Sequence, residues 1–147
     1  MHGHVSAVLA DKGRQVYTVA RGESVREAVR HMNDNGVGAL LVLDGADPVG
    51  IFTERDVLRR VVGVGRDPDN TRVADVMTTD LVVIEPSTPV DQAMAIMTHQ
   101  RCRHLPVVEE HEVVGLVSIG DLIRWISFNQ EVEIQYLVDY IQGRRTA

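Results

Sequence analysis

The 147-residue sequence has little cysteine, few aromatic residues and a deficit of positive charge. Its single cysteine, Cys102, excludes an intrachain disulfide and fits a reducing compartment. Lysine and arginine number 15 against 21 aspartates and glutamates, which gives a formal net charge of −6. Because nonspecific binding to phosphate backbones requires clustered cations, this balance argues against nucleic acid as a partner.

Long apolar runs are also missing. No stretch approaches 18 uninterrupted apolar residues, and the sequence shows no basic-then-apolar leader. We therefore expect a soluble, cytoplasmic protein that has no membrane partner. With 44% hydrophobic residues, the chain can nevertheless bury a core, either as one compact domain or as two small ones.

An internal repeat organises the chain. Shifting the sequence against itself aligns residues 16–61 with residues 81–126 without a gap. Equivalent positions keep their chemistry, as in the pairs Val25 and Val90, Gly50 and Gly115, and Asp56 and Asp121. Neither copy, of about 46 residues, could bury enough surface by itself, so the duplication predicts two units that pack together.

Each copy predicts a strand, a helix, two further strands and a second helix. The first strands are β-branched runs at 16–19 and 81–84, and the first helices begin at the capping residues Ser24 and Thr88. The middle strands form hairpins around the acidic turns DGADP and EEHE. One side of each last helix is predicted to be buried, through Val57, Leu58, Val61 and Val62 in the first copy and Leu122, Ile123 and Ile126 in the second.

The predicted domain boundaries follow this repeat. Residues 1–65 form the first repeat with a lead-in helix, residues 66–127 form the second repeat, and residues 128–147 form an amphipathic helix and tail. The apolar residues of the last segment recur at helical spacing, at Val132, Ile134, Leu137, Val138 and Ile141. Two interpretations of this helix remain open: it covers its own core, or it forms a dimer.

The most informative motif occurs once in each copy, as GIFTERD at 50–56 and GLVSIGD at 115–121. In each, a hydroxyl residue stands three positions before an aspartate at the start of the last helix. The simplest interpretation is a helix N-cap. The hydroxyl then accepts a hydrogen bond from a free backbone N–H, and the carboxylate favours the positive end of the helix.

A second interpretation of the same motif is nucleotide binding. The hydroxyls of Thr53 and Ser118 lie at strand-to-helix turns, where free N–H groups can hold a phosphate. The carboxylates of Asp56 and Asp121 can each accept two hydrogen bonds from the vicinal hydroxyls of a ribose. In the first copy, Arg55 is close enough in sequence to reach that phosphate.

The repeat resembles the CBS domain, and the pair resembles a Bateman module over roughly residues 5–126. The resemblance rests on GIFTERD and GLVSIGD, on LPVV at 105–108, and on the helix starts SVREAV and PVDQAM. The segments VSIGDLIRW and YIQG are similar to free-standing CBS pairs of bacteria and plant organelles. The family implies an α/β fold of two β-α-β-β-α units around a pseudo-twofold axis, with two clefts for adenosine-containing ligands, and a homodimer of such pairs.

The resemblance also implies site residues. Each cleft combines the motif of one repeat with the first strand of the other, and the loop before the second strand lines it. The first cleft then uses Ser118 and Asp121 with Thr18, Val19 and Ala20, and the second uses Thr53, Arg55 and Asp56 with Val83 and Ile84. The lining loops contribute Gly38, Ala39, Arg103, His104, Leu105 and Pro106. Ribose would bind Asp121 or Asp56, and phosphates would lie near Thr53, Ser118, Arg55, Arg103 and His104.

The implied ligands share adenosine. They are AMP, ADP or ATP, with NAD(H) in one cleft if the small Gly38–Ala39 loop leaves room for a dinucleotide, and S-adenosylmethionine has the same moiety. We expect no metal, because the spacing of His99, His104 and His111 specifies no metal site. Cys102 lies between two arginines that could lower its pKa, although its counterpart Val37 indicates an apolar position.

Three functional hypotheses follow. The first is a regulatory nucleotide sensor, for energy or redox state, that controls a partner in trans; the plant-organelle resemblance makes a thioredoxin-type protein one candidate. The second is a ligand-free dimerisation or scaffold protein whose motifs are only caps. The third, an enzyme, finds no support, because the sequence contains no nucleophile elbow, Walker loop or zinc-protease motif.

Overall fold

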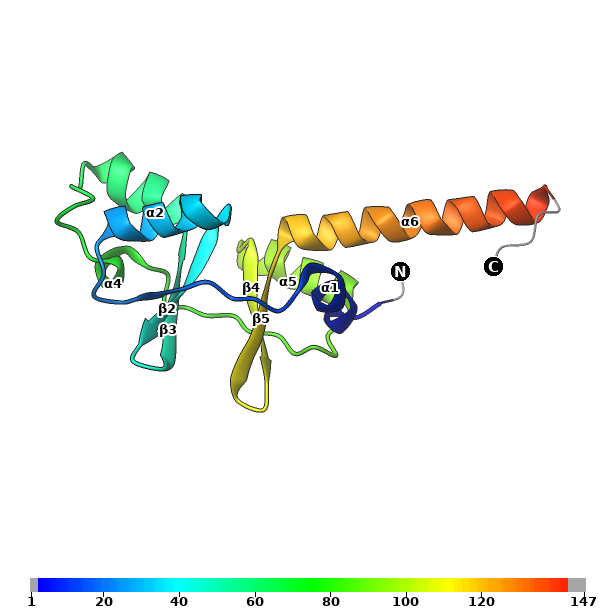
Figure 1. Ribbon diagram of the computed structural model, residues 1–147, viewed down its shortest axis with the longest axis horizontal. Helices are drawn as coiled ribbons and strands as arrows, with labels where there is room; N and C mark the ends of the chain where they lie inside the picture. Colours follow the sequence, from blue (N-terminus) through cyan, green and yellow to red (C-terminus); the bar gives the residue numbers. More distant parts are fainter. Residues whose placement is uncertain (1–2, 143–147) are drawn as a thin grey trace. The chain divides into compact units, whose positions relative to one another are not determined.

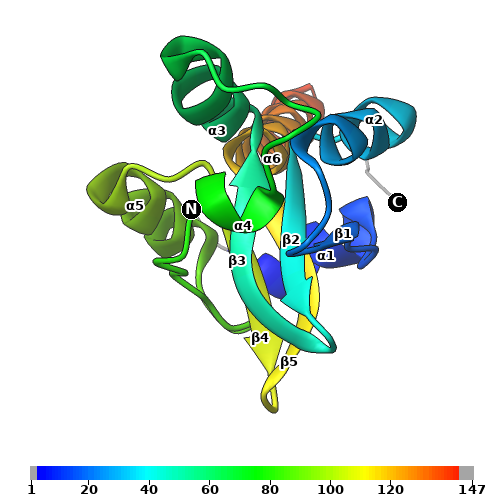
Figure 2. The same cartoon turned by 90° about the vertical axis from the view of Figure 1, so that its left-hand side faces the viewer.

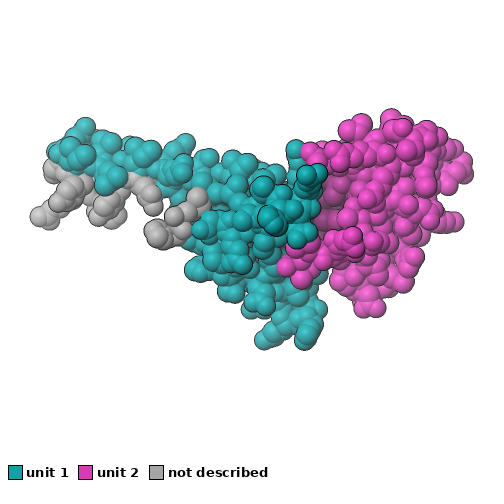
Figure 3. All heavy atoms as spheres, turned by 180° about the vertical axis from the view of Figure 1, so that it is seen from behind, with its two compact units in different colours: residues 1–14, 84–147 teal, residues 15–83 magenta. Residues whose placement is uncertain are grey.

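The computed structural model describes residues 3–142, without the side chains at 132, 133, 136 and 140. The chain divides into two compact units (Figure 3), each described here by itself. Unit 1 comprises the residues up to Arg14 together with those from Ile84 onward, and unit 2 comprises Gln15–Val83. Both units mix helices with a small β-sheet, as the α/β prediction requires (Figure 1).

Unit 2 contains the first repeat. Strands β1 (Thr18–Ala20), β2 (Ala39–Asp44) and β3 (Asp47–Thr53) form a sheet in which β1 pairs parallel and β3 antiparallel to β2. Helix α2 (Val25–Asn35) follows β1. It begins at Ser24, whose hydroxyl accepts from the Glu27 N–H, and it ends at Gly36 in the left-handed conformation. The predicted hairpin and cap are confirmed.

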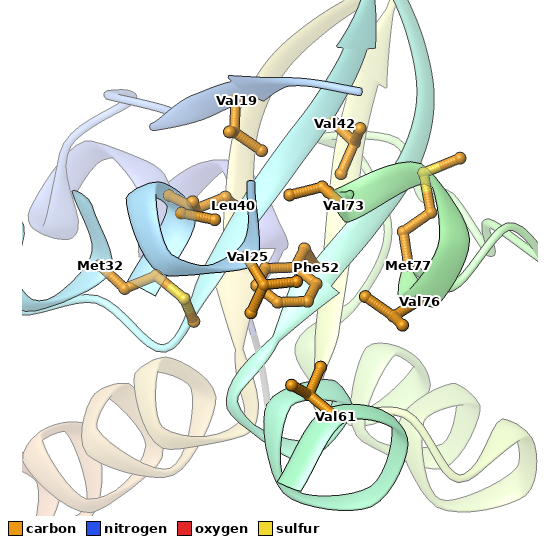
Figure 4. Packing of buried hydrophobic residues seen from close by; sticks show 11 residues of the cluster. Val19, Val25, Met32, Leu40, Val42, Phe52, Val61, Val73, Val76 and Met77 are labelled. Atoms are coloured by element: carbon orange, nitrogen blue, oxygen red, sulfur yellow. The ribbon is translucent and has the colours of Figure 1, made fainter. Parts of the chain in front are cut away.

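The last helix of the first repeat is irregular. It runs through α3 (Glu54–Asp56), the π-helical η1 (Val57–Val61) and the 3₁₀-helical η2 (Val62–Val64). Helix α4 (Val73–Val76) then lies against β3 (Figure 2). The core forms between these helices and the sheet (Figure 4), and its fully buried side chains include Val25, Leu40, Phe52, Val61 and Val73.

Unit 1 contains the second repeat. Helix α5 (Val90–Gln100) precedes the antiparallel hairpin of β4 (His104–Glu109) and β5 (Glu112–Ser118), and α6 (Ile119–Ile141) follows it. Helix α1 (Val5–Lys12) completes the unit through contacts with β5 and α6. The buried residues of unit 1 include Val5, Leu9, Val90, Met97, Leu105, Val117 and Leu122.

The strand predicted at 81–84 is wrong for the described chain, where only Ile84 makes a parallel bridge, to Val107. The bridge keeps two hydrogen bonds, from Ile84 N to Pro106 O at 3.0 Å and from Val108 N to Ile84 O at 2.8 Å. In the first repeat, two more bonds flank the equivalent pair, donated by the N–H groups of Leu41 and Arg21. Their counterparts in the second repeat are prolines, Pro106 and Pro86, which have no N–H to donate.

The lead-in helices pack on the copy that they do not precede in sequence. Helix α1 precedes the first repeat but belongs to unit 1, and α4 precedes the second repeat but belongs to unit 2. The same backbone bonds fix both: Val5 N donates to Thr88 O, and Val73 N donates to Glu23 O, its equivalent. The predicted boundaries at 65 and 127 follow the sequence repeat, whereas the compact units follow these contacts.

The predicted buried sides of the last helices need correction. Val61 and Leu122 are buried as predicted, but Leu58, Val62 and Ile123 are exposed large apolar residues. The terminal segment is also not a separate helix, because α6 continues from the second motif to Ile141. Its residues Ile134, Leu137, Val138 and Ile141 are exposed, so within the described residues this helix does not cover its own core; the side chain of Val132 and residues 143–147 lie outside the description.

Candidate functional site: two capped aspartates

In unit 2, the Thr53 motif forms a complete capping box. The Asp56 N–H donates to Thr53 Oγ1 at 3.3 Å, and the Thr53 N–H donates to Asp56 Oδ2 at 3.0 Å. These two bonds satisfy groups that a helix start otherwise leaves unpaired. The capping interpretation of this motif is therefore confirmed.

Further donors occupy the Asp56 carboxylate. The hydroxyl of Thr78, which follows α4, donates to Oδ1 at 3.1 Å, and Arg60 Nε lies 3.7 Å from the same oxygen. Asp56 is only 5% exposed. A buried carboxylate needs such partners, because an unpaired charge away from water is costly. A ribose could use Asp56 only by displacing donors of the folded unit itself.

In unit 1, the Ser118 motif forms the same two bonds. The Ser118 N–H donates to Asp121 Oδ2 at 2.8 Å, and the Asp121 N–H donates to Ser118 Oγ at 3.1 Å. The side chain of Asp121 is 13% exposed, compared with 7% for Asp56. The second motif is thus also a helix cap, but its carboxylate is more open to solvent.

Lys12, at the end of α1, reaches the Asp121 carboxylate. Its Nζ donates to Asp121 Oδ2 at 2.6 Å and to the backbone oxygen of Leu116. The Lys12 side chain is 34% exposed, so the ion pair lies at the rim of the unit. Arg124 approaches from α6, with Nη2 at 3.5 Å from Asp121 Oδ1. A cation is therefore held at the carboxylate that was predicted to bind ribose.

These contacts change the titration of neighbouring groups. Burial alone would raise the pKa of Asp121, but hydrogen bonds from Lys12 and Ser118 outweigh it and hold this pKa below its ordinary value. Burial, followed by the positive charge of Lys12, lowers the pKa of His104 to about 4. His104 is then neutral at pH 7, so any contact that it makes with a phosphate there is not that of a cation.

The structure places the predicted lining loops beside the motifs. In unit 2, the Glu54 N–H donates to Gly38 O at 3.1 Å, and in unit 1, the Ile119 N–H donates to Arg103 O at 2.9 Å, at equivalent positions. Some predicted lining residues have little exposed surface: Val19, Ala39, Ile84, Leu105 and Pro106 are buried. The predicted residues Thr18, Ala20, Arg55, Val83 and Arg103 are exposed.

Sequence reasoning missed Lys12 and Thr78, although both contact a motif aspartate. Neither lies in the aligned repeat pattern, and Lys12 is 109 positions away from Asp121. A local signal does exist in hindsight: V-x-x-V followed by an apolar residue occurs at 5–9 and at 73–77, and each contacting residue follows one copy. The pattern identifies two equivalent helices but not the units on which they pack.

Other candidate chemistry is weaker. Burial raises the pKa of the Cys102 thiol, so the suggestion that its neighbouring arginines activate it is wrong. Among the side chains that the structure describes, no group of three or more histidine, cysteine or acidic residues is arranged to hold a metal ion. Over residues 3–142, every helix is too short or too polar to cross a membrane.

The fold and the two capped motifs define a class of protein. The family model for the CBS domain matches residues 5–63 and 73–128, so the chain belongs to the CBS-domain family. Members are typically regulatory modules rather than enzymes and generally bind adenosine ligands. Both the α/β fold class and the tandem arrangement predicted from the repeat are confirmed.

Particular CBS-domain proteins resemble the chain in sequence or in structure. The chain is 37% identical over 148 residues to the mitochondrial CBS domain-containing protein CBSX3 of Arabidopsis thaliana, covering 95% of this chain and 72% of the relative. A protein with CBS domains from Burkholderia ambifaria is 44% identical, with a TM-score of 0.82 over 84% of this chain and 93% of that one. A hexameric CBS-CP12 protein from bloom-forming cyanobacteria is 25% identical, with a TM-score of 0.78 over 97% and 87%.

Proposed function

We propose that the protein is a regulatory module that binds an adenosine nucleotide and controls a partner protein in trans. The observation that carries this proposal is the Asp121 carboxylate. It lies at a strand-to-helix turn and is partly open to solvent, and one of its hydrogen-bond donors is the long, partly exposed side chain of Lys12. A carboxylate of this kind can exchange a lysine ammonium for the two hydroxyls of a ribose.

The two motifs are not equivalent in this proposal. Asp56 accepts hydrogen bonds from Thr53 and Thr78 of its own unit, with Arg60 at 3.7 Å, whereas Asp121 accepts from the long side chain of Lys12, with Arg124 at 3.5 Å. We therefore assign the primary ligand, AMP, ADP or ATP, to Ser118 and Asp121. In unit 2 the Glu54 carboxylate lies against Gly38, and this negative charge disfavours phosphate there, so NAD(H) is the weaker candidate ligand.

Three further features stay predictions. They are the ligand clefts that combine the motif of one repeat with the first strand of the other, the thioredoxin-type partner, and the cytoplasmic location. The homodimer is also a proposal, supported by the exposed apolar residues Leu58 and Ile123, which are equivalent in the two repeats, and by those near the end of α6. A hexameric relative agrees with self-association in general.

A ligand-free scaffold is the alternative function. One observation favours it: both motifs are complete caps whose carboxylates already have hydrogen-bond partners. In that case, adenosine compounds would leave the stability of the protein unchanged.

A thermal-shift panel separates the two functions. The panel contains AMP, ADP, ATP, NAD+, NADH and S-adenosylmethionine, measured on the wild type, D121N and D56N. A ligand at about 100 times its Kd adds about 2.7 kcal/mol and raises Tm by several degrees. We expect AMP, ADP or ATP to raise Tm, and D121N to remove the shift.

The matched control is D91N. Asp91 is also a first-turn carboxylate in unit 1, on α5, but it caps only the neighbouring N–H of Gln92. If D91N and D121N lower the ligand shift equally, the effect comes from helix capping rather than binding. No shift with any compound would support the scaffold.

A further inference from the structure

Lys12 is held in place by a helix that is firmly anchored in unit 1. Val5, Val8 and Leu9 of α1 are buried, and the Leu9 side chain lies so close to Gly115 that an added Cβ would meet it at 2.7 Å. Upstream, the ring of Trp125 covers Gly3. The backbone of Lys12 is therefore fixed, and only its four-carbon side chain is free to move.

The surroundings of the Lys12 ammonium are predominantly cationic. Arg124 lies near Asp121, the charge of Arg103 acts on His104 together with that of Lys12, and His104 itself is neutral at pH 7. The anion that compensates Lys12 is Asp121, with the Leu116 oxygen as a neutral second acceptor. If another donor replaces Lys12 at the Asp121 carboxylate, the Lys12 ammonium keeps only the neutral Leu116 oxygen and has lost its anionic partner.

We propose that Lys12 is the residue by which this site distinguishes a phosphorylated nucleotide from a neutral nucleoside. The inference rests on the proposed binding of ribose to Asp121. A ribose that binds Asp121 displaces Lys12 from Oδ2. A phosphorylated ligand brings an anion that can pair with the released ammonium, whereas a neutral nucleoside does not.

The second motif lacks this property. There, the donor from the lead-in segment is the neutral hydroxyl of Thr78. The cation near Asp56 is Arg60, which lies 3.7 Å from Oδ1 and is also held by the Met77 backbone oxygen at 2.8 Å. Discrimination through a displaced lysine therefore belongs to the Ser118 and Asp121 site alone among the described residues. A ligand that binds at Asp56 would be insensitive to changes at Lys12.

The test compares adenosine with AMP by isothermal titration calorimetry on the full chain. The quantity measured is the ratio of the Kd of adenosine to the Kd of AMP, for the wild type, K12M, K12Q and K12R. K12Q guards against misfolding, because its amide can still donate to Leu116 O. R14M is the matched control, since it removes the same charge two residues along the chain.

The expected result is a ratio that falls about tenfold in K12M and K12Q, because a charge-assisted hydrogen bond contributes about that factor. Adenosine should bind more tightly to K12M than to the wild type. K12R and R14M should keep the wild-type ratio. A ratio in K12M and K12Q equal to the wild-type ratio would overturn the inference, as would an equal loss of affinity for both ligands.

The proposed function fails in a different way. If neither AMP nor adenosine binds the wild type or K12M, ribose binding at Asp121 is wrong, and the role of Lys12 falls with it. If both ligands bind the wild type and the ratio of their Kd values is unchanged in K12M and K12Q, only the inference about Lys12 is wrong.

Discussion

The Nζ of Lys12 lies 2.6 Å from Oδ2 of Asp121, although the two residues are 109 positions apart. This ion pair ties the end of α1 to the first turn of α6. Its counterpart in the other unit is the hydrogen bond from Thr78 to Asp56. Each motif aspartate therefore receives a donor from the lead-in segment packed on its unit. The two donors differ in charge, which makes the two motifs chemically unequal.

The ion pair should stabilise unit 1 in a pH-dependent way. Because the pKa of Asp121 is lowered in the folded state, its contribution is present above the unfolded value near 3.8 and is lost as the pH falls through the folded value. We expect K12M to lower the free energy of unfolding by about 1 kcal/mol at pH 7, since the pair is partly exposed. Urea unfolding at pH 7, 5 and 3 measures this. A deficit that persists unchanged at pH 3 would assign it to lost packing.

His104 should make the protein less stable in mild acid. The pKa of its side chain is about 4 in the folded state, against an ordinary value of 6.5. Between pH 6.5 and pH 4, His104 is therefore protonated in the unfolded state and neutral in the folded state, which favours unfolding. Stability should fall by about 2 to 3 kcal/mol between pH 6.5 and pH 4. NMR titration of the His104 ring checks the midpoint, and H104Q should flatten the pH dependence. A midpoint near 6.5 would contradict the prediction.

Two equivalent glycines should tolerate alanine differently. A Cβ at Gly115 would meet the end of the Leu9 side chain at 2.7 Å, whereas at Gly50 it would meet the Thr78 backbone oxygen at 2.9 Å as well as the Met77 sulfur. A side-chain end can shift, but the Thr78 backbone is fixed by its bridge to Ile51. We expect G50A to cost about 3 kcal/mol and G115A about 1 kcal/mol. Urea unfolding of the two variants measures these losses. A larger loss of stability in G115A than in G50A would refute this account.

The exposed apolar residues should mediate self-association. One set, Leu58 and Ile123, lies on the last helices of the two repeats, and the other, Ile134 and Leu137, lies near the end of α6. Sedimentation of the wild type should show a dimer or a larger assembly. We expect either L58E with I123E, or I134E with L137E, to dissociate it, which identifies the surface. A monomeric wild type, or assemblies unaffected by both pairs, would disprove the homodimer.

The sequence by itself determined the duplicated unit, the two hairpins, the caps at Ser24, Thr53 and Ser118, and the CBS-domain family. The cap predicted at Thr88 is wrong, because α5 begins after Pro89 and the Thr88 hydroxyl accepts from the Glu85 N–H instead. The confirmed features depend on local patterns. Ser24 and Thr53 stand beside the N–H groups that they cap, and the alternation of the hairpin strands needs only neighbouring residues. Even the shortened first strand of the second repeat has a local cause, because Pro86 and Pro106 lack the donors that Arg21 and Leu41 supply.

Only the tertiary structure decided which lead-in helix packs on which repeat, and therefore which donor meets which aspartate. The sequence pattern at 5–9 and 73–77 is compatible with either pairing, since its last apolar residue, Leu9 in one copy and Met77 in the other, packs against an equivalent glycine, Gly115 or Gly50. It also left open which apolar residues of the last helices are exposed, as Leu58 and Ile123 are. Burial and long-range ion pairing depend on residues brought together by folding, and no spacing along the chain records them.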